Sequence, residues 1–326
     1  MERISVIVPA YNTAPWLVRC LDSLLAQTHE NMEVVVVNDG SKDNTKEILD
    51  AYAADHPTVK VIHKENGGVT SARLRGVQEA SGDWIGFVDG DDVIEPDMYA
   101  HLLANAYEAE ADIAHCGHRV LFPDGRVELV HGTGEKRTQD HVTALRDLLD
   151  GGVIESGLCT KLFRRELFAG LEEKMDLSIK NNEDLLMNFF LFEKAQKAVF
   201  EDICPYHYIL RQGSASYRQL HEHSIFDPIR VRQIILDSCG EEMKMDARIA
   251  LLRNLLFAYA QLALRMEKEF DGFRSRVRKM LKEQKEYFPL LSKRNQVLAH
   301  LVCTAPWAFT FAYGTYVKLF QREEQH

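Results

Sequence analysis

FVDGDDVIEP, residues Phe87–Pro96 of this 326-residue chain, carries the end of a predicted strand and a dense group of acidic residues. It leads from an apolar run directly into three carboxylates, Asp89, Asp91 and Asp92, within four positions. Like charges this close repel one another unless a cation lies among them. Carboxylates one residue apart at a strand end suit a hard divalent ion, Mg²⁺ or Mn²⁺, that substrate phosphates also ligate. The alternative is an acidic turn that caps the helix beginning near Pro96.

Four segments in the first part of the chain are predicted strands: Ile4–Ala10, Val34–Val37, Val59–His63 and Trp84–Val88. The first two are continuous apolar runs, which are typical of strands buried on both faces. Segments with apolar residues at helical spacing lie between them, at 16–25, 45–54 and 69–80. This alternation predicts an α/β fold with a mostly parallel sheet and helices on both faces. Ligands of such sheets bind in the crevice at the carboxyl ends of the strands.

Each predicted strand is followed by polar residues that are able to bind a ligand. In chain order they are Tyr11 and Asn12, then Asp39, then Asn66 with two glycines, and finally Asp89 with Asp91. Because the carboxyl ends of parallel strands meet at one edge of a sheet, we expect these side chains in a single crevice.

The pattern changes in the second half of the chain. Residues 112–120 predict a strand within a mixed α/β region, and residues 181–192 predict an amphipathic helix. From about Ile225 the sequence is helical and rich in Leu, Arg, Lys and Glu. We therefore place a domain boundary near residues 217–225.

Composition limits the classes of function. The net charge of −10 argues against a general nucleic-acid binder. The six cysteines are scattered without a CxxC pair, which favours reduced thiols over a disulfide framework or a zinc site. The apolar run at the N-terminus is too short for a signal peptide, so we expect a cytoplasmic protein.

Five segments occur in an order that resembles the family 2 glycosyltransferases with the GT-A fold. They are SVIVPAYN, VVVVNDGSKDNT, NGGVTSARLRGV, SGDWIGFVDGDD and NNEDLLMN. The resemblance covers about residues 3–215 and is specific only as a set. It implies a GT-A catalytic domain over residues 1–220, with a nucleotide-binding half (1–110) and an acceptor-binding half (111–220). Residues 221–326 would be a helical C-terminal extension.

The resemblance also implies a UDP-sugar site held by a metal ion. The residues expected to bind the nucleotide-sugar are Pro9, Tyr11, Asp39, Asn66, Arg73, Asp89, Lys161 and Arg211. Asp39 would accept a hydrogen bond from the uracil N–H, although a carboxylate here also suits a turn. Asp91, together with Asp89, would ligate the Mn²⁺ or Mg²⁺ that bridges the diphosphate, and Asp92 is the less certain member. Lys161 and Arg211 would close over the diphosphate.

The catalytic base is expected at the start of the helix over 181–192. Asp184 matches the aspartate of the family's ED motif, which takes the proton of the acceptor hydroxyl, and Glu183 would be its neighbour or bind the acceptor. In-line attack would invert the anomeric centre. Acidic residues are also favoured in any first helical turn, which is the structural alternative. Processive relatives often carry a QxxRW motif near here, and its absence favours transfer of a single sugar.

Residues 297–317 contain no Asp, Glu, Lys or Arg and are rich in aromatic residues. Residues 265–294, which precede them, carry ten Lys and Arg against five Asp and Glu. This combination suits a peripheral contact with an anionic membrane surface, on the inner face of the cell membrane. Spanning the bilayer and packing as a core helix pair are the alternatives. The acceptor would be a saccharide or a lipid-linked saccharide of a surface polysaccharide.

Three rival functions are weighed against this reading. A catalytically silent scaffold with the same fold would have no chemical reason to keep Asp39, Asp89, Asp91 and Asp184. A haloacid-dehalogenase-type phosphatase would place its nucleophilic aspartate after the first strand, whereas FVDGDDV follows the fourth. A nucleotidyltransferase would require a Gly- and Lys-rich loop after the first strand, and PAYNTAPW lacks one.

Overall fold

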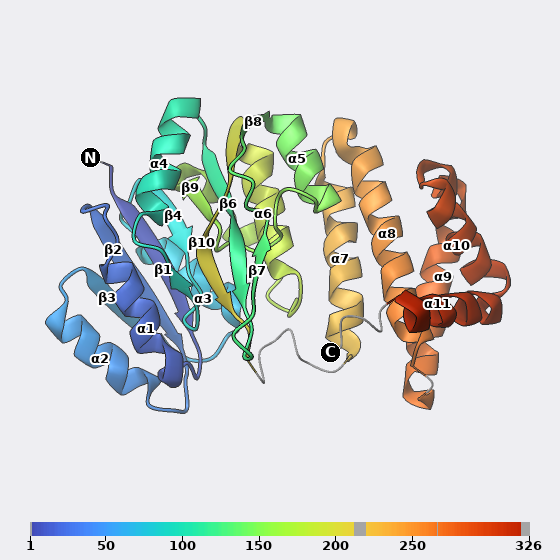
Figure 1. Ribbon diagram of the computed structural model, residues 1–326, viewed down its shortest axis with the longest axis horizontal. Helices are drawn as coiled ribbons and strands as arrows, with labels where there is room; N and C mark the ends of the chain where they lie inside the picture. Colours follow the sequence, from blue (N-terminus) through green and yellow to red (C-terminus); the bar gives the residue numbers. More distant parts are fainter. Residues whose placement is uncertain (1, 212–219, 266, 321–326) are drawn as a thin grey trace. The chain divides into compact units, whose positions relative to one another are not determined.

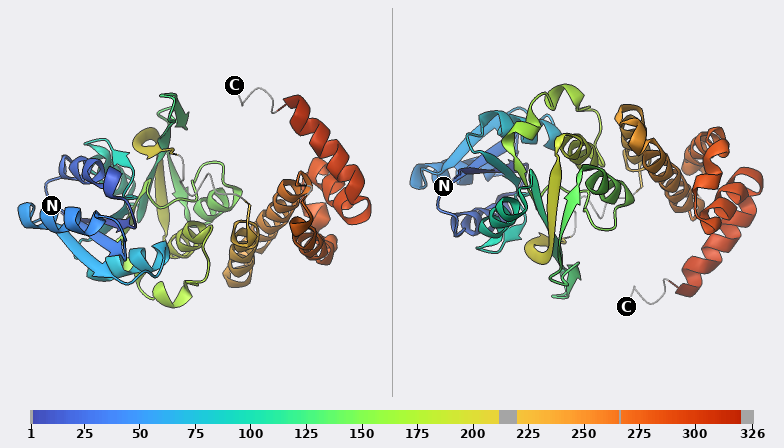
Figure 2. Two further views of the ribbon diagram at one scale, coloured as in Figure 1. Left: turned by 90° about the horizontal axis from the view of Figure 1, so that it is seen from below. Right: turned by 90° about the horizontal axis from the view of Figure 1, so that it is seen from above.

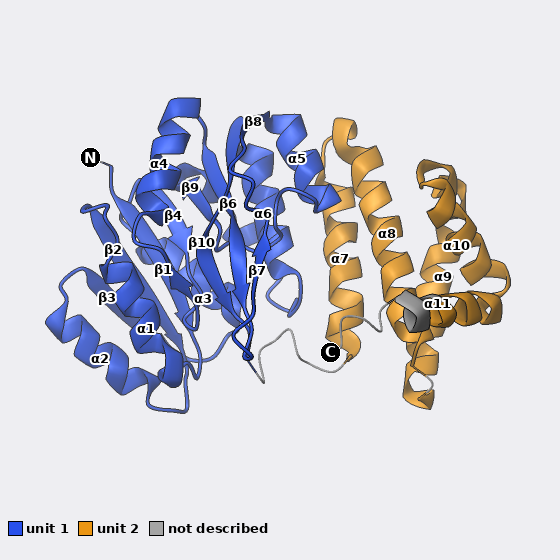
Figure 3. Ribbon diagram, viewed as in Figure 1, with its two compact units in different colours: residues 1–219 blue, residues 220–326 orange. Residues whose placement is uncertain are grey.

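The computed structural model describes residues 2–211, 220–265 and 267–320. The chain divides into two compact units, residues 1–219 and residues 220–326 (Figure 3). The first unit is built around one mixed sheet, and the second consists of helices (Figure 1). This arrangement confirms the predicted mostly parallel α/β sheet with flanking helices and a helical C-terminal region.

The first four strands form the parallel part of the sheet, in the order β3-β2-β1-β4. Their bounds are β1 Ile4–Ala10, β2 Met32–Asp39, β3 Val59–Lys64 and β4 Trp84–Phe87. The helices between them are α1 Ala14–Leu25, α2 Thr45–Asp55 and α3 Val69–Glu79. Every residue of β1 and β4 is buried, as expected for strands with helices on both faces (Figure 2).

The rest of the sheet is mixed. Strand β9 (Lys161–Arg164) lies between β4 and β6 (Ile113–Leu121) and is antiparallel to both. Strand β10 (Lys197–Ile209) runs parallel to β6 and antiparallel to β5 (Val93–Ile94). The remaining elements of this part are β7 Val127–Val130, β8 Lys136–Asp140, α4 Met98–Ala109, α5 His141–Asp150, α6 Glu183–Lys194 and the short 3₁₀ helices Arg165–Phe168 and Glu172–Lys174.

Helix α3 lies very close to β1, and a glycine makes this approach possible. A Cβ atom on Gly76 would lie 2.4 Å from Cγ2 of Ile7, a separation that real side chains do not tolerate. Ile7 is fully buried at the centre of β1. The same helix carries Arg73, so this contact fixes where Arg73 lies relative to the strand ends.

The second unit contains five longer helices among its described residues. They are α7 Glu222–Ser238, α8 Lys244–Ala263, α9 Asp271–Glu283, α10 Lys293–Thr304 and α11 Pro306–Phe320, with 3₁₀ helices at Glu241–Met243, Lys268–Phe270 and Lys285–Leu290. Phe309 of α11 is buried and meets the ring of Tyr259 on α8 at a centroid distance of 5.4 Å. Within the described part of the chain, no helix has both the length and the apolar character needed to cross a bilayer.

Candidate active site

The carboxylates after β4 lie beside a buried arginine. Arg73 of α3 is only 3% exposed, and its Nη2 donates to Oδ1 of Asp89 at 3.0 Å. Its Nη1 donates to Oδ1 of Asp184 and lies 3.9 Å from Oε1 of Glu183. Burial lowers the pKa of Arg73, but the charges of Asp184 and Asp89 raise it by more, so the guanidinium stays protonated. Arg73 therefore places a positive charge among these acidic residues, which their mutual repulsion makes necessary.

Asp91 is held by a second arginine. Arg211, just after β10, donates from Nε to Oδ2 of Asp91 at 2.9 Å and also from Nη2. The guanidinium carbon of Arg211 lies 3.7 Å from the ring centroid of Trp16 on α1, a cation–π geometry. Two carboxylates of the cluster thus each contact their own guanidinium.

Asp92 faces the protein interior. It is 1% exposed, its Oδ2 accepts a hydrogen bond from the hydroxyl of Tyr206 at 2.5 Å, and its Oδ1 accepts one from the N–H of Ile209 at 2.9 Å. Burial raises the pKa of Asp92 well above its ordinary value, and the nearby charges of Asp89 and Asp91 add to that shift. Asp92 therefore ties the carboxylate loop to β10.

The donor set fits a divalent cation that is shared with a substrate. Asp89 and Asp91 are partly exposed and offer carboxylate oxygens, which Mg²⁺ and Mn²⁺ prefer. Among the described residues, no group of three or more His, Cys, Asp or Glu side chains is arranged to hold a metal alone. A cation here would take most of its ligands from phosphate and water, as Mg²⁺ usually does.

Asp39 organises the loop that follows β3. It is 3% exposed, and its carboxylate accepts hydrogen bonds from the N–H groups of Gly67 at 2.9 Å and Gly68 at 2.8 Å. Nζ of Lys64 lies 2.6 Å from Oδ1 of Asp39, and the side chain of Asn66 donates to its carbonyl oxygen. A contact of Asp39 with uracil remains a prediction and would have to share these oxygens.

The ends of β1 and β2 are tied together beside the carboxylate loop. The N–H of Asn12 donates to Oγ of Ser41, and Oδ1 of Asn12 accepts from the N–H of Lys42 at 2.8 Å. Tyr11 is 45% exposed, whereas Pro9 is buried, and a Cβ on Gly90 would lie 3.2 Å from the carbonyl oxygen of Pro9. The strand ends expected to share a crevice therefore lie next to one another.

Glu183 and Asp184 occupy the first turn of α6. The side chain of Asp184 is 24% exposed, and burial raises its pKa, while Arg73 opposes the shift. Burial and the charge of Asp184 also raise the pKa of Glu183. A carboxylate with a raised pKa and some exposure can accept a proton near neutral pH, so the environment suits a general base.

Lys161 has a different environment from the one expected. It is fully buried in β9, and its Nζ donates to the carbonyl oxygens of Glu155, at 2.8 Å, and Gly157. Burial lowers the pKa of Lys161 to about 8. A contact with a bound diphosphate remains a prediction and would require the ammonium to leave these carbonyls.

Two contributors were missed in the sequence. Tyr206 anchors Asp92 from 114 positions away, and Trp16 lies under Arg211. Both contacts depend on where β10 ends in the sheet, so neither has a local signal in the sequence.

Comparison with known proteins identifies the family of this chain. The model of the family described as "Glycosyl transferase family 2" matches residues 5–171. The glycosyltransferase EpsJ of Bacillus subtilis is 35% identical over 201 residues, which are 61% of this chain and 58% of EpsJ. The glycosyltransferase GlyA of Streptococcus pneumoniae is 30% identical over 264 residues, or 78% of this chain and 37% of GlyA. The chain thus spans about a third to three fifths of these relatives.

Solved structures share the fold. Residues 1–349 of S. aureus TarS superpose with a TM-score of 0.73 at 20% identity, over 100% of this chain and 93% of the TarS fragment. The same fragment in complex with UDP-GlcNAc gives a TM-score of 0.70 at 21% identity over the same shares. At these identities the likeness shows the fold alone.

Proposed function

This chain belongs to glycosyl transferase family 2, and we propose that it transfers a single sugar from a UDP-sugar to a saccharide or lipid-linked acceptor, with inversion at the anomeric carbon. The family supplies the reaction class and excludes the phosphatase alternative. UDP as the carrier is supported by the TarS fragment, which binds UDP and UDP-GlcNAc. Synthesis of a surface polysaccharide is our proposal for the pathway.

One observation carries the proposal: Arg73 contacts both Asp89 and Asp184. It joins the end of β4, where a nucleotide diphosphate would bind, to the start of α6, where the acceptor would be deprotonated. The three residues are up to 111 positions apart in the chain. If the acidic residues after β4 only formed a structural turn, Arg73 would not also need to contact Asp184.

A divalent cation completes the donor site in this proposal. Asp89 and Asp91 would hold Mn²⁺ or Mg²⁺, which would stabilise the negative charge that develops on the leaving diphosphate. Arg211 already contacts Asp91, so it lies where it could donate to the same phosphates once they arrive. Trp16 limits the directions in which Arg211 can move.

Asp184 is the proposed general base. Its carboxylate accepts the proton of the acceptor hydroxyl as that oxygen attacks the anomeric carbon on the face opposite the leaving group. Arg73 holds the carboxylate in place through Oδ1, and the partial exposure of Asp184 leaves it reachable by an acceptor. Glu183 lies beside it and is the proposed contact for a neighbouring acceptor hydroxyl.

Peripheral binding to an anionic membrane surface is a further part of the proposal. Trp307 and Phe311 are each 76% exposed and lie one helical turn apart on α11. Such aromatic residues favour the interface between water and lipid. This location would place the enzyme next to a lipid-linked acceptor.

The decisive experiment is a screen of nucleotide-sugars for UDP release by the purified protein, with and without Mn²⁺. Metal-dependent release from one UDP-sugar supports the proposal and excludes the silent scaffold. If none of the donors releases UDP, with Mn²⁺ or with candidate acceptors, while UDP itself binds, the scaffold alternative holds.

A further inference from the structure

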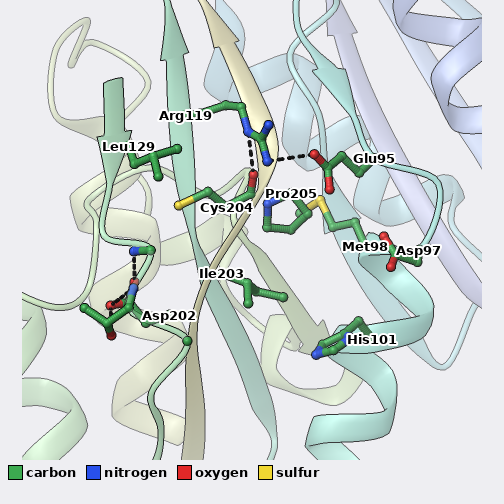
Figure 4. Close-up of a pocket in the computed structure, with 13 residues that line it drawn as sticks. Glu95, Asp97, Met98, His101, Arg119, Leu129, Asp202, Ile203, Cys204 and Pro205 are labelled. Carbon is green, nitrogen blue, oxygen red and sulfur yellow. Dashed lines mark hydrogen bonds and ion pairs between the residues drawn. The ribbon is translucent and has the colours of Figure 1, made fainter. Parts of the chain in front are cut away.

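A cavity of about 480 Å³ lies at β10, away from the carboxylate cluster (Figure 4). It is lined by the start of α4, by β6 and β7, by the loop after β7 and by an interruption in β10. Neighbouring residues of a strand point to opposite faces of a sheet. Tyr206 contacts Asp92 of the candidate active site, whereas Nε2 of His207 lies 3.2 Å from Oε1 of Glu95, which lines the cavity.

The wall of this cavity is formed by a bulge. Strand β10 leaves the register of β6 between Glu201 and Tyr206, so four residues of β10 lie opposite one residue of β6, Gly117. A Cβ on Gly117 would lie 2.5 Å from the carbonyl oxygen of Val130 and 3.1 Å from that of Ile203. No larger residue fits there, which shows that the bulge is tightly packed and not loose.

A buried carboxylate holds the adjoining loop in place. Asp202 accepts hydrogen bonds from the N–H groups of Gly132 and Thr133 and from the hydroxyl of Thr133. These bonds lower its pKa by more than burial raises it, so Asp202 stays ionised. His131, with a φ of 78°, lies in the left-handed region, so the loop is fixed in a conformation that is costly for a non-glycine residue.

An ion pair between Arg119 and Glu95 lines the cavity. Nε of Arg119 donates to the carbonyl oxygen of Cys204 at 3.0 Å, and its Nη2 lies 2.7 Å from Oε1 of Glu95 (Figure 4). A guanidinium has five N–H donors, and these contacts account for two of them. Asp97 at the start of α4 adds a second, exposed carboxylate.

The charges and surfaces of this cavity select one class of ligand. Three carboxylates line the cavity (Glu95, Asp97 and Asp202) against one guanidinium, Arg119, and one imidazole, His101, so phosphate and other anions are disfavoured. A neutral saccharide fits, because its hydroxyl groups donate to carboxylates and accept from a guanidinium. Apolar side chains such as Leu129 and Ile203 provide contacts for its C–H faces, and Met98 is buried beneath them. The volume lies within the usual range for sites of small molecules.

We propose that this cavity is a second carbohydrate site, which binds a neutral saccharide through Arg119, Glu95 and Asp97. The identification of that saccharide as a distal part of the acceptor or product chain rests on the proposed function. The site is linked to the carboxylate loop, because β5 pairs with Tyr206 and His207, and the N–H of Glu95 donates to the carbonyl oxygen of Pro205. A saccharide bound in the cavity would therefore contact the part of the sheet whose strand β10 holds Asp92 through Tyr206.

The test measures binding without turnover. The full-length protein is applied to an array of neutral and acidic oligosaccharides, and its ¹³C-methyl methionine NMR spectrum is recorded with the neutral di- and tetrasaccharides that it retains. We expect retention of neutral glycans and a shift of the Met98 methyl signal, assigned with Met98→Leu. Arg119→Gln and Asp97→Asn should each weaken saccharide binding about tenfold, the loss expected for a hydrogen bond to a charged group.

Matched controls separate the site from general effects of charge. Arg126→Gln and Asp124→Asn change the same residue types in the exposed turn between β6 and β7 and should leave saccharide binding unchanged. The proposal is overturned if no neutral glycan is retained by protein that still binds UDP, or if both cavity variants bind like the unmodified chain. Saccharide binding that maps to Met98 without consumption of any UDP-sugar would sink the proposed function and leave the second site standing.

Discussion

Arg73 and Arg211 show how single residues make a dense acidic cluster compatible with folding. Each guanidinium contacts one of the two exposed carboxylates after β4, and Asp92 is satisfied separately by Tyr206 and Ile209. The cluster is therefore neutralised in part before any ligand binds. A metal and a diphosphate that arrive together bring charges that nearly cancel, which would let the arginines change partners at little cost.

Replacement of Asp91 by alanine tests the proposed metal site. We expect Asp91→Ala to lower turnover by about 10²-fold or more, since metal stabilisation of the leaving charge contributes several kcal/mol. Metal-dependent UDP binding should disappear, as measured by calorimetry with and without Mn²⁺. Asp124→Ala, in an exposed turn, is the control. Unchanged UDP affinity of Asp91→Ala in Mn²⁺ would rule out Asp91 as a ligand.

Replacement of Asp184 by asparagine keeps the shape of the side chain and removes the proposed base. The expected loss of transfer rate is about 10²–10⁴-fold, while donor binding should persist because the proposed diphosphate contacts lie on other elements. Rates of transfer and UDP affinity would both be measured, with Glu183→Gln as the neighbouring comparison. If Asp184→Asn transfers normally and Glu183→Gln does not, the base is Glu183.

The pH dependence follows from the surroundings of Asp184. Burial and Asp89 raise its pKa, whereas Arg73 and Lys161 lower it, with a net upward shift. Because the base must be ionised, kcat/KM should rise with pH through a limb that lies above about 3.9, the ordinary value for aspartate. Arg73→Gln removes a lowering charge, so it should move this limb to higher pH. If the pH profile of kcat/KM is the same for Arg73→Gln and the unmodified chain, a group other than Asp184 is titrating.

At the scale of elements, the position of Arg73 depends on the packing of α3 against β1. Gly76→Ala would place a methyl group 2.4 Å from Ile7, so we expect a loss of about 1–3 kcal/mol in the free energy of unfolding. The control is Gly272→Ala, at a helical position with open space around it, which should be neutral or stabilising by up to about 1 kcal/mol. Denaturant titration of the two variants measures their free energies of unfolding. Equal stability of the two variants would mean that α3 can shift without cost.

The elements differ in how far the sequence could predict them. Strands β1 to β4 and helices α1 to α3 were predictable, because runs rich in β-branched residues alternate there with segments whose apolar residues have helical spacing. Strand β9 was not, since its four residues, KLFR, are half basic. Strand β10 contains Pro205 and a bulge, and its partners β6, β8 and β5 come from three separate parts of the chain.

The candidate site divides in the same way. Asp39, Asp89, Asp91 and Asp184 could be proposed from strand ends and the family motifs. Their partners could not, because Arg73 reaches Asp184 across 111 positions and Tyr206 reaches Asp92 across 114. Such contacts are decided by the order of strands in the sheet, and a local pattern of residues contains no information about that order.

At the scale of the whole molecule, the two units differ in charge. Residues 1–219 have 22 Lys and Arg against 36 Asp and Glu, a net charge of −14, and residues 220–326 have 17 against 13, a net charge of +4. An anionic surface would therefore repel the first unit and attract the second. Part of the uncharged tail is core, since Ala299, Val302 and Phe309 are buried, and deletion of residues 295–326 would uncover α8. Point variants test the membrane proposal without that damage.

The residues to be changed are Trp307 and Phe311 on α11, Lys282 at the end of α9 and Lys285 at the start of the following 3₁₀ helix. Both lysines are exposed and lie close enough to Cys303 to lower its pKa against the effect of burial. We expect the protein to sediment with vesicles that contain anionic lipid, at about 1 kcal/mol for each basic residue near the surface, and to be released by salt. Trp307→Ser with Phe311→Ser should abolish the salt-resistant part, which depends on buried aromatic area.

Two control pairs make this last prediction specific. Lys282→Gln with Lys285→Gln should weaken binding to anionic vesicles, whereas Lys46→Gln with Lys60→Gln, an equal change of charge in the first unit, should not. Phe257→Ser removes another exposed aromatic side chain, on α8, and is the control for the aromatic pair. Because a basic surface would repel a second copy of itself, self-association explains these residues less well than a lipid surface does. If the unmodified chain ignores anionic vesicles yet dimerises through Trp307 and Phe311 in sedimentation velocity, the membrane proposal is wrong and that face is a protein interface.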